Sequence, residues 1–275
     1  MIQDISPYRL DTAYRDTIPA PDDCFFSFRG EDVLLRDMGD GRRSLPSFRD
    51  LGHPAGKMES RAVFLFRVCK EPVYLLGQEM SGCRGLGYFP ICELKDVLPE
   101  WAFFAGATAL HLSRWYEGNR YCGRCSGRME RKPGQRALAC PECGNTVYPG
   151  IAPVVMVAVT DGDRLLMTKY ADRSLPQWVL ISGFVETGET LEEAAEREVY
   201  EETGIRIRDL RYFGSQPWGF SGSVIAGYTA RLDGPDGIRL DRKELAAAEW
   251  HPRTGLPDGL TDISIAYEMI EALRL

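Results

Sequence analysis

Residues 183–205, GFVETGETLEEAAEREVYEETGI, hold eight glutamates, a residue type that can bind cations or move protons. We predict that Thr190–Thr203 within this stretch is a helix. On a helical wheel that advances about 100° per residue, an apolar stripe runs along one side. Its members are Leu191, Ala194, Ala195 and Val199. The glutamates on the opposite side, which we expect to be solvated, are Glu192, Glu193 and Glu196.

Two other glutamates of this helix do not fit a solvated face. Glu198 and Glu202 fall inside the apolar stripe, and Glu201 lies beside them. Carboxylates turned toward a core repel one another and lose hydration unless positive charge compensates them. Arg197 is a single cation that the wheel puts away from this cluster, so divalent metal ions with oxygen ligands are the better explanation. The pattern therefore indicates a metal site on the inner side of the helix.

Four of the eight cysteines form two CxxC pairs that are separated by fourteen residues. The pairs are Cys122 with Cys125 and Cys140 with Cys143. Two such pairs supply four thiolates to one tetrahedral Zn²⁺, and the spacing is close to that of a zinc ribbon. Because all four ligands are cysteines, no position is left for a substrate water, and we expect a structural zinc. The alternative is a set of buried or redox cysteines.

Basic residues outnumber acidic ones around the paired cysteines, where the only glutamates are Glu117 and Glu130 before the second pair. The basic residues are Arg114, Arg120, Arg124, Arg128, Arg131, Lys132 and Arg136. A basic zinc ribbon can bind nucleic acid. The alternative, which we favour, is a solvated basic face or one that pairs with acidic groups elsewhere in the protein.

The elements that must position the glutamates indicate a mixed α/β domain over residues 150–275. Val154–Thr160 and Arg164–Lys169 are predicted strands joined by an Asp-Gly-Asp turn, which is a hairpin signal. The acidic helix follows them. The remaining elements are predicted at Leu210–Gly214 and Val224–Arg231, both strands, and at Ile263–Leu273, a second helix.

Residues 1–117 are expected to form a β-rich domain that ends in a helix, and residues 118–149 the zinc ribbon. The predicted strands of the first domain are Asp32–Arg36, Ala62–Val68 and Val73–Gly77, separated by turn-rich stretches. The helix runs from Trp101 to about Glu117. The sequence does not indicate what residues 1–113 do.

Composition sets limits on partners and compartment. The chain has 275 residues, 44% hydrophobic and 27% charged, with a net charge of −7, so it does not attract anionic polymers as a whole. The first residues have no secretory signal, and no apolar run approaches the ~18–20 residues that span a bilayer. We therefore expect no membrane partner, reduced cysteines and a cytoplasmic location.

The acidic stretch resembles the Nudix box, GX5EX7REUXEEXGU, at every defined position, from Gly183 through Glu189 to Arg197-Glu198-Val199-Tyr200-Glu201-Glu202-Thr203-Gly204-Ile205. This resemblance implies the Nudix fold, an α/β/α sandwich around a mixed sheet. It also implies hydrolysis of a diphosphate that links a nucleoside to a second group. The expected cofactor is Mg²⁺ or Mn²⁺, in addition to the structural Zn²⁺.

The resemblance assigns roles to individual residues. It implies that Glu198, Glu201 and Glu202 bind the metal ions and that Glu189 pairs with Arg197 to hold the loop. Metal ions neutralise a diphosphate and lower the pKa of a bound water, and a carboxylate can take its proton. Glu202 is the expected catalytic base and Glu201 the alternative. Further metal ligands are expected from Glu244 and from the backbone carbonyl of Ala266.

A second stretch bears on the substrate. Residues 215–223, SQPWGFSGS, resemble the SQPWPFPxS array of NADH pyrophosphatases within the Nudix family, with Gly219 and Ser221 in place of two prolines. A zinc ribbon directly before the Nudix domain is similar to the layout of that subfamily. Tyr148-Pro149 and Pro153 resemble its YPRxxP junction, with Gly150 where arginine is usual.

This subfamily resemblance implies substrate-binding roles for Tyr148, Phe184, Gln216 and Ser223. It also implies a homodimer. The leading hypothesis is hydrolysis of NAD(H) to NMN(H) and AMP, with removal of 5′ NAD caps from RNA as an extension. The alternatives are a Nudix hydrolase for ADP-ribose or another dinucleotide, and a non-catalytic zinc-ribbon protein that binds nucleic acid. The preference among NAD, NADH and NAD-capped RNA stays open, as does the number of catalytic metal ions.

Overall fold

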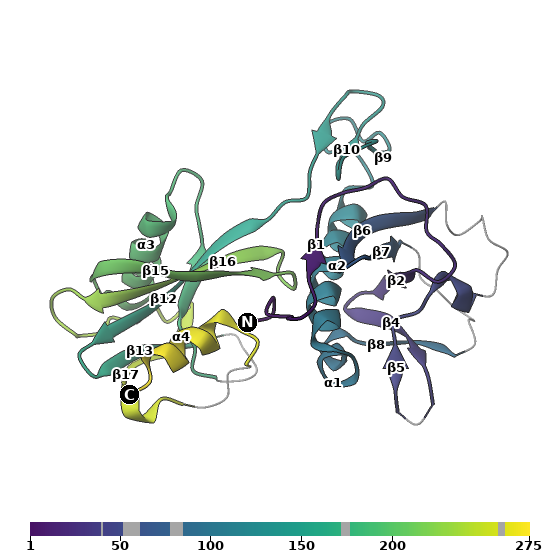
Figure 1. The fold of residues 1–275 in the computed structure, drawn as a ribbon. Coiled ribbons are helices and arrows are strands. Elements are labelled where there is room, and N and C mark those ends of the chain that lie inside the picture. Colours follow the sequence, from purple (N-terminus) through teal and green to yellow (C-terminus); the bar gives the residue numbers. More distant parts are fainter. Residues whose placement is uncertain (40, 52–60, 78–84, 172–176, 258–261) are drawn as a thin grey trace. The chain divides into compact units, whose positions relative to one another are not determined.

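The computed structural model describes residues 1–275 except 40, 52–60, 78–84, 172–176 and 258–261. The chain divides into two compact units, whose elements are labelled in Figure 1. Unit 1 comprises Met1–Ile2, Ile151–Trp218 and Ser223–Leu275. Unit 2 comprises Gln3–Gly150 and Gly219–Gly222 and contains the paired cysteines. The three domains expected from the sequence, with the ribbon as a domain of its own, stay a prediction.

Unit 1 is built on a mixed sheet of strand order β15-β16-β12-β13-β17, with β14 paired to β12. The strands are β12 (Ala152–Asp161), β13 (Arg164–Tyr170), β14 (Ile181–Phe184), β15 (Ile207–Trp218), β16 (Ser223–Leu232) and β17 (Leu245–Pro252). Strands β12 and β16 run parallel, and the other pairs are antiparallel. The expected mixed sheet is therefore confirmed, and β14 and β17 are strands that the sequence did not predict.

Helices α3 (Leu191–Thr203) and α4 (Ile265–Leu273) cover opposite faces of this sheet (Figure 1). The alternation of side chains along β12 explains the two faces. Val155, Val157 and Val159 pack in one core cluster with the apolar side of α3. Met156 and Ala158 pack in another cluster with Ile265, Met269 and Ile270 of α4. This is the α/β/α sandwich that the sequence predicts.

The boundaries of α3 follow from its caps. Thr190 accepts a hydrogen bond from the backbone N–H of Glu193, and the Glu193 side chain accepts one from Thr190 N–H, which is a capping box. Gly204 ends the helix in the left-handed region, with φ 71°. Glu193 is thus a capping residue as well as an exposed one. Glu192, also exposed, accepts a hydrogen bond of 2.9 Å from the hydroxyl of Tyr228.

Unit 2 contains two small sheets, the long helix α2 (Glu100–Gly118) and the ribbon. One sheet has the order β1-β6-β7-β2, and in the other β4 pairs with β3, β5 and β8. The strands are β1 (Leu10–Asp11), β2 (Cys24–Phe26), β3 (Phe28–Arg29), β4 (Asp32–Asp37), β5 (Arg43–Ser44), β6 (Ala62–Val68), β7 (Glu71–Leu76) and β8 (Leu86–Pro90). Short helical segments are η1 (Phe48–Leu51), η3 (Ile91–Glu93) and α1 (Leu94–Val97), and in unit 1 η4 (Arg253–Gly255).

The predictions for the N-terminal region hold closely. Strand β6 has the predicted bounds, and β4, β7 and α2 differ from prediction by one or two residues at an end.

Three two-residue strands, β9 (Glu130–Arg131), β10 (Leu138–Ala139) and β11 (Thr146–Val147), form the sheet of the ribbon. Among the described helices, none has the length and apolar character that crossing a membrane requires.

Candidate active site and zinc site

Two backbone turns of the same construction hold the paired cysteines. In the first, Cys122 N–H donates to Gly127 O and Ser126 N–H donates to Cys122 O, both at 2.8 Å. In the second, Cys140 N–H donates to Asn145 O at 2.8 Å and Gly144 N–H donates to Cys140 O at 2.9 Å. The fourth residue after the first cysteine has positive φ in both turns, 64° at Ser126 and 73° at Gly144. Each turn therefore aims its two sulfurs in the same way.

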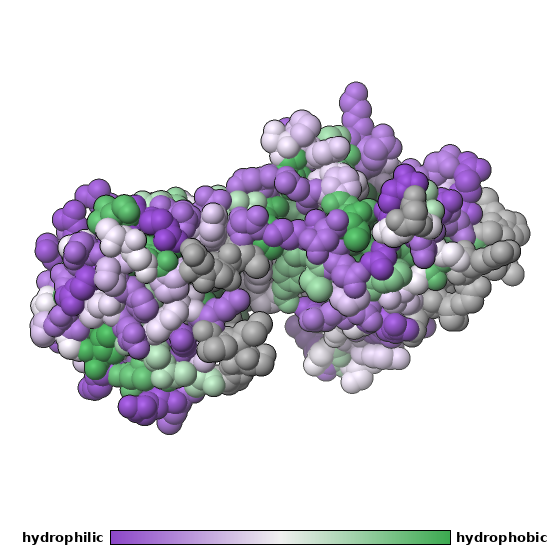
Figure 2. Space-filling model, turned by 90° about the horizontal axis from the view of Figure 1, so that it is seen from below, coloured by the Kyte–Doolittle hydropathy of each residue, from purple (hydrophilic) through white to green (hydrophobic). Residues whose placement is uncertain are grey.

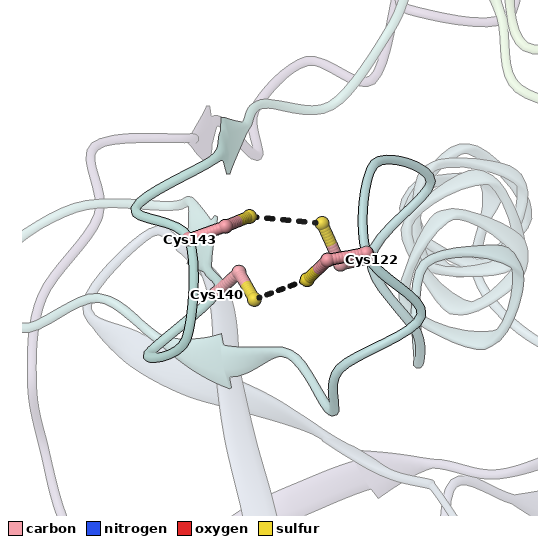
Figure 3. Close-up of side chains that lie close together, drawn as sticks. Cys122, Cys140 and Cys143 are labelled. Atoms are coloured by element: carbon pink, nitrogen blue, oxygen red, sulfur yellow. Dashed lines mark hydrogen bonds between the residues drawn. The ribbon is translucent and has the colours of Figure 1, made fainter.

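The sulfur atoms face one another across these turns, as Figure 3 shows for Cys122, Cys140 and Cys143. All lie within 4.8 Å of one another, with Cys122 to Cys143 at 3.6 Å and Cys125 to Cys140 at 3.4 Å. Four thiolates about 2.3 Å from one zinc ion at tetrahedral angles lie roughly 3.8 Å apart, so the set fits zinc. Hydrogen bonds within the set act in both directions: the backbone N–H of Arg124 helps to lower the pKa of Cys122 to about 6, whereas the neighbouring thiols Cys143 and Cys140 help to raise the pKa of Cys125 to about 12. The cysteines form the zinc site of the ribbon, as the sequence predicts.

Several of the basic residues around the ribbon have partners inside unit 2. Arg131 and Arg136 donate to the backbone carbonyls of Ala62 and Leu65 in β6, and so tie the ribbon to the first sheet. Arg114 pairs with Glu31 at 2.6 Å. Arg120 lies 3.9 Å from Glu117. Arg114 and Arg120 thus pair with acidic groups, as in the alternative that the sequence favoured, whereas Arg131 and Arg136 bind backbone carbonyls.

The glutamates of α3 separate into buried and exposed groups, as the helical wheel predicts. Glu198 is 9% exposed and Glu202 is 3% exposed, whereas Glu192 and Glu196 are exposed. The Glu201 side chain, at 60%, lies at the rim of the cluster. Among the described residues, the Oε2 atom of Glu202 has no hydrogen-bond partner although it is buried. A buried carboxylate oxygen without a donor is costly, so this atom suits a ligand that brings positive charge.

Arg197 lies at the centre of these carboxylates. It donates to both oxygens of Glu189 at 2.5 and 2.9 Å, to Glu198 at 2.7 Å and to Glu201 at 3.1 Å. It also donates to the carbonyl oxygen of Phe184 at 3.0 Å. The prediction that Arg197 lies away from the cluster is wrong, because its long side chain reaches back to residues that the wheel separates. The pairing with Glu189 is the one that the resemblance implies, and it lowers the pKa of Glu189 to about 2.

Gly183 of β14 explains how Glu198 fits beside the sheet. A Cβ atom at this position would lie 2.0 Å from Cδ of Glu198 and 2.2 Å from its nearest oxygen. The Glu198 carboxylate therefore occupies the space that any side chain at Gly183 would need. This contact gives a physical reason for glycine as the first residue of the acidic stretch.

Burial shapes the protonation of the cluster. Burial, together with the charges of Glu198, Glu244 and Asp241, raises the pKa of Glu202 to about 8. Burial also raises the pKa of Glu198, against the opposing effect of Arg197. Each of these carboxyl groups is therefore destabilised in its charged form unless further positive charge arrives.

The segment before β17 brings two more carboxylates to this end of unit 1. Asp241 N–H donates to the carbonyl of Glu202 at 2.9 Å, and Ala171 N–H donates to the carbonyl of Glu244 at 2.8 Å. The charge of Glu244 acts on both Glu198 and Glu202, which is consistent with its predicted place near the cluster. The sequence did not predict a role for Asp241. Its position three residues before Glu244 was the only feature of the sequence that pointed to it.

The predicted substrate-binding residues have different environments. Phe184 is 56% exposed at the end of β14, next to the Arg197 contact, and Tyr148 is 58% exposed in unit 2. Ser223 is buried at the start of β16. Gln216 is fully buried, donates to Ile263 O and accepts from Ile265 N–H, both at 2.7 Å. Both polar ends of Gln216 thus hold the start of α4.

Ala266 and the glutamates belong to different helices, which cover opposite faces of the sheet. Ala266 lies in the first turn of α4 and is 6% exposed. Helix α4 covers one face of the sheet, whereas Glu198 and Glu202 lie on α3, which covers the other (Figure 1). The expected role of the Ala266 backbone carbonyl as a metal ligand stays a prediction.

The departure at Gly219 has a local cause. Gly219–Gly222 belongs to unit 2, where a Cβ at Gly219 would lie 2.1 Å from the carbonyl oxygen of Ala107 in α2. Proline, which the resemblance predicts here, carries a Cβ and would clash with this carbonyl. Nothing in the structure explains the serine at position 221.

Comparisons with known proteins agree with this geometry. The NUDIX domain family matches residues 150–273, and the NADH pyrophosphatase zinc ribbon domain family matches residues 119–148. The NAD-capped RNA hydrolase NudC of Vibrio atlanticus is 37% identical over 181 residues, 65% of this chain and 67% of the relative. The protein of the same name from Deinococcus radiodurans is 34% identical over 245 residues, 86% of this chain and 82% of the relative.

A solved NUDIX hydrolase from Nitrosomonas europaea aligns with a TM-score of 0.42 and 24% identity, over 50% of this chain and 80% of that one. The two family matches cover the glutamates of unit 1 and the cysteines of unit 2. The chain belongs to the Nudix hydrolase family, among the members that carry the NADH pyrophosphatase zinc ribbon.

Proposed function

We propose that this protein hydrolyses the diphosphate bond of NAD(H) to NMN(H) and AMP, and that it removes NAD caps from RNA. The observation that carries the proposal is the burial of two glutamates, Glu198 and Glu202, on one helix. Arg197 is the one cationic residue of α3 that can offset their negative charge. A Nudix chain that keeps such a pair at its box has the residues for metal-dependent hydrolysis. The names of its relatives, NAD-capped RNA hydrolase NudC, support the choice of substrate.

Mg²⁺ or Mn²⁺ is the cation that we propose for this site. The residues fit a hard divalent ion, because Glu198, Glu201, Glu202 and Glu244 offer only carboxylate oxygens. The Oε2 atom of Glu202, which is buried and has no hydrogen-bond partner among the described residues, would gain most from a bound cation. When bound, a divalent cation neutralises charge on the diphosphate oxygens and makes a nearby water more acidic. How many ions bind stays open.

Glu202 is the proposed catalytic base. With a pKa of about 8 it holds a proton near neutral pH, and added positive charge beside it restores the carboxylate. In that form Glu202 accepts a proton from the water that attacks phosphorus, while the bond from phosphorus to the bridging oxygen breaks. Glu201 is the alternative base, and its exposed position makes it the weaker choice.

The remaining polar residues position these groups. Glu189 anchors Arg197, and Arg197 in turn fixes the carboxylates of Glu198 and Glu201. Phe184 offers an exposed ring for a base or nicotinamide. For Gln216 we propose an indirect role, because its amide already holds the start of α4 at both ends. Tyr148, Ser223 and Ala266 stay predicted contacts to substrate or metal.

The decisive experiment compares four substrates on one preparation with Mn²⁺: NADH, NAD, ADP-ribose and NAD-capped RNA. We expect AMP and NMNH from NADH, and a 5′-monophosphate RNA from the capped transcript. Chromatography of the products and kcat/KM for each substrate rank them. Cleavage of ADP-ribose alone would contradict the proposed substrate and leave the hydrolase class intact. The change at Gly219, which alters the array resembling SQPWPFPxS, is the reason for including ADP-ribose.

Two further proposals concern the state of the protein. Four thiols that bind zinc need reducing conditions, so we propose the cytoplasm as its compartment. A homodimer is proposed by resemblance to the subfamily, and sedimentation equilibrium at micromolar protein tests it. A monomer that turns over NADH at full rate would contradict the dimer.

A further inference from the structure

A groove of about 530 Å³ opens in unit 1 near the carboxyl ends of β12 and β16, beside the end of α4. Its basic residues are Arg208, Arg211, Arg231 and Arg253. Its acidic residues are Asp161 and Asp209. The volume lies within the range of small-molecule sites, about 300–1,000 Å³. This set, called the arginine groove below, has no part in the hydrolysis described above.

A β-bulge places the arginines of β15 side by side. Arg208 pairs with Arg231 and Arg211 pairs with Thr229, so three steps along β15 match two along β16. Asp209 supplies the extra residue, with φ 54° in the left-handed region that non-glycine residues seldom adopt. In a regular strand, residues 208 and 211 would point to opposite faces. The bulge turns both toward the groove.

The charges in the groove are incompletely compensated. Arg208 and Arg231 are directly opposite each other on paired strands, an arrangement of like charges that is destabilising. Asp209 lies between them, 3.5 Å from Arg208 and 3.7 Å from Arg231, and Asp233 reaches Arg208 only at 3.9 Å. Asp161 pairs with Arg164, which is not part of the groove.

Among the described residues, the other two arginines form no ion pair. Arg253 donates to the carbonyl oxygens of Leu273 at 2.6 Å and Gly162 at 3.1 Å, and neither oxygen carries a full charge. Within the described part of the chain, Arg211 has no ion-pair partner. The groove therefore has an excess of positive charge in a chain whose net charge is −7.

The arginine groove is separate from the carboxylate cluster. Thr229 and Arg231 share a face of β16 with Ile225 and Gly227, against which α4 packs. Tyr228 points to the other face and bonds to Glu192 of α3. Figure 2 shows unit 1 from below the view of Figure 1, where hydrophilic residues predominate around small apolar patches. The glutamates and the arginines thus lie on opposite faces of one sheet.

We propose that the arginine groove binds phosphate groups of a nucleotide or of an RNA chain. The guanidinium fork matches two phosphate oxygens at once, and Arg208 with Arg231 forms a pair that a bound anion would relieve. The inference rests on the groove alone. It deepens the proposed function only if the ligand is RNA, in which case the groove holds phosphodiesters away from the scissile bond.

Titration calorimetry tests the proposal with three probes in buffer without added divalent metal: inorganic phosphate, AMP and an uncapped eight-nucleotide single-stranded RNA. We expect Arg211→Gln and Arg231→Gln to weaken binding about tenfold each and to reduce its salt dependence. Arg239→Gln is the matched control, because it removes the same charge from the α3 side, where Arg239 stacks on Tyr200. Arg231→Gln should melt no lower than the wild type, since it removes a like-charge pair.

The outcomes separate this inference from the proposed function. Binding of RNA but not AMP identifies a phosphodiester chain as the ligand, and binding of AMP identifies a mononucleotide; both support the groove. NADH turnover should be unchanged in all three variants. Equal affinity of the wild type, Arg211→Gln and Arg231→Gln, or no binding of any probe to the wild type below about 1 mM, overturns the proposal.

Discussion

In the zinc ribbon, each pair of ligands lies within one short backbone turn, whereas the carboxylates of unit 1 come from α3 and from the segment before β17. The turns aim their sulfurs through bonds such as Cys122 N–H to Gly127 O. Glu198 lacks such local support and depends on Arg197 and on the space above Gly183. Local turns can build a closed structural site, whereas the hydrolytic site needs tertiary contacts to hold repelling charges together.

The two sites also differ in what they leave unsatisfied. Among the described residues, only the four cysteines form a group of ligands within 4.8 Å of one another. The carboxylates are more spread, and one oxygen of Glu202 has no hydrogen-bond partner in the part of the chain that the structure describes. A site that must accept and release a substrate needs such open positions, whereas a structural zinc site is closed. The following predictions test this contrast, from the largest effect to the smallest.

Glu202→Gln should give the largest effect, a fall in kcat of about 10³-fold or more, because it removes the proposed base and a proposed carboxylate ligand together. AMP release from NADH, followed by chromatography, measures it. Glu196→Gln is the matched control, since it changes an exposed glutamate of the same helix and should retain full turnover. A Glu202→Gln protein within tenfold of the wild type would remove Glu202 from its proposed role.

Gly183→Ala should reduce kcat about 100-fold, because the new methyl group displaces the Glu198 carboxylate that lies 2.0 Å from its position. The same NADH assay applies, with a melting curve to check folding. Gly214→Ala in β15 is the control, as no heavy atom lies within 4 Å of its Cβ position. Full activity of Gly183→Ala would mean that the position of Glu198 does not matter.

Cys140→Ser should act on stability more than on chemistry. Loss of one thiolate weakens zinc binding, and we expect the melting temperature of unit 2 to fall by roughly 5–10 °C. Zinc content by atomic absorption and calorimetry of unfolding measure the two effects. Cys69→Ser, an exposed cysteine outside the ribbon, should change neither. If Cys140→Ser abolished turnover while zinc and stability stayed normal, the zinc would not be structural.

The smallest effect concerns the pH dependence of stability without divalent metal. The folded pKa of Glu202, about 8, lies above its ordinary value of 4.5, so the folded state binds the extra proton. Its contribution to stability is complete below pH 4.5 and is lost as the pH rises toward 8. The wild type should therefore melt a few degrees below Glu202→Gln at pH 8 and equally at pH 4.5.

Added Mn²⁺ provides the control for this last prediction. Positive charge beside Glu202 stabilises its carboxylate, so the difference at pH 8 should shrink or reverse in favour of the wild type. Thermal melts of both proteins at both pH values, with and without Mn²⁺, give the four differences in melting temperature that are needed. If the difference in melting temperature between the two proteins were the same under all conditions, burial would not raise the pKa of Glu202.

Sequence patterns predicted the longer strands and three helices, and they missed the short strands of unit 2 and two strands of the unit 1 sheet, the latter for a physical reason. Strand β6 and helix α3 have strong periodicity or caps, and their predicted bounds agree with the structure to one residue. Strand β17, LAAAEWHP, has neither alternation nor β-branched residues, and forms because it pairs with β13. Strand β14 has four residues, among them Gly183, and pairs with β12. Such segments become strands because the fold places a neighbouring strand beside them.

What the sequence by itself determined is local. The cysteine spacing defines the zinc ligands, because both members of each pair lie in one turn, and the helical period separates buried Glu198 and Glu202 from exposed Glu196. Tertiary structure decided the contacts made by long side chains and distant segments. Because of it, Arg197 bonds to Glu198, and the side-chain amide of Gln216 forms hydrogen bonds at the start of α4. It also places α4, with Ala266, on the opposite face of the sheet from the glutamates. The length of the side chains and the packing of helices on the sheet determine these contacts, and spacing along the chain does not.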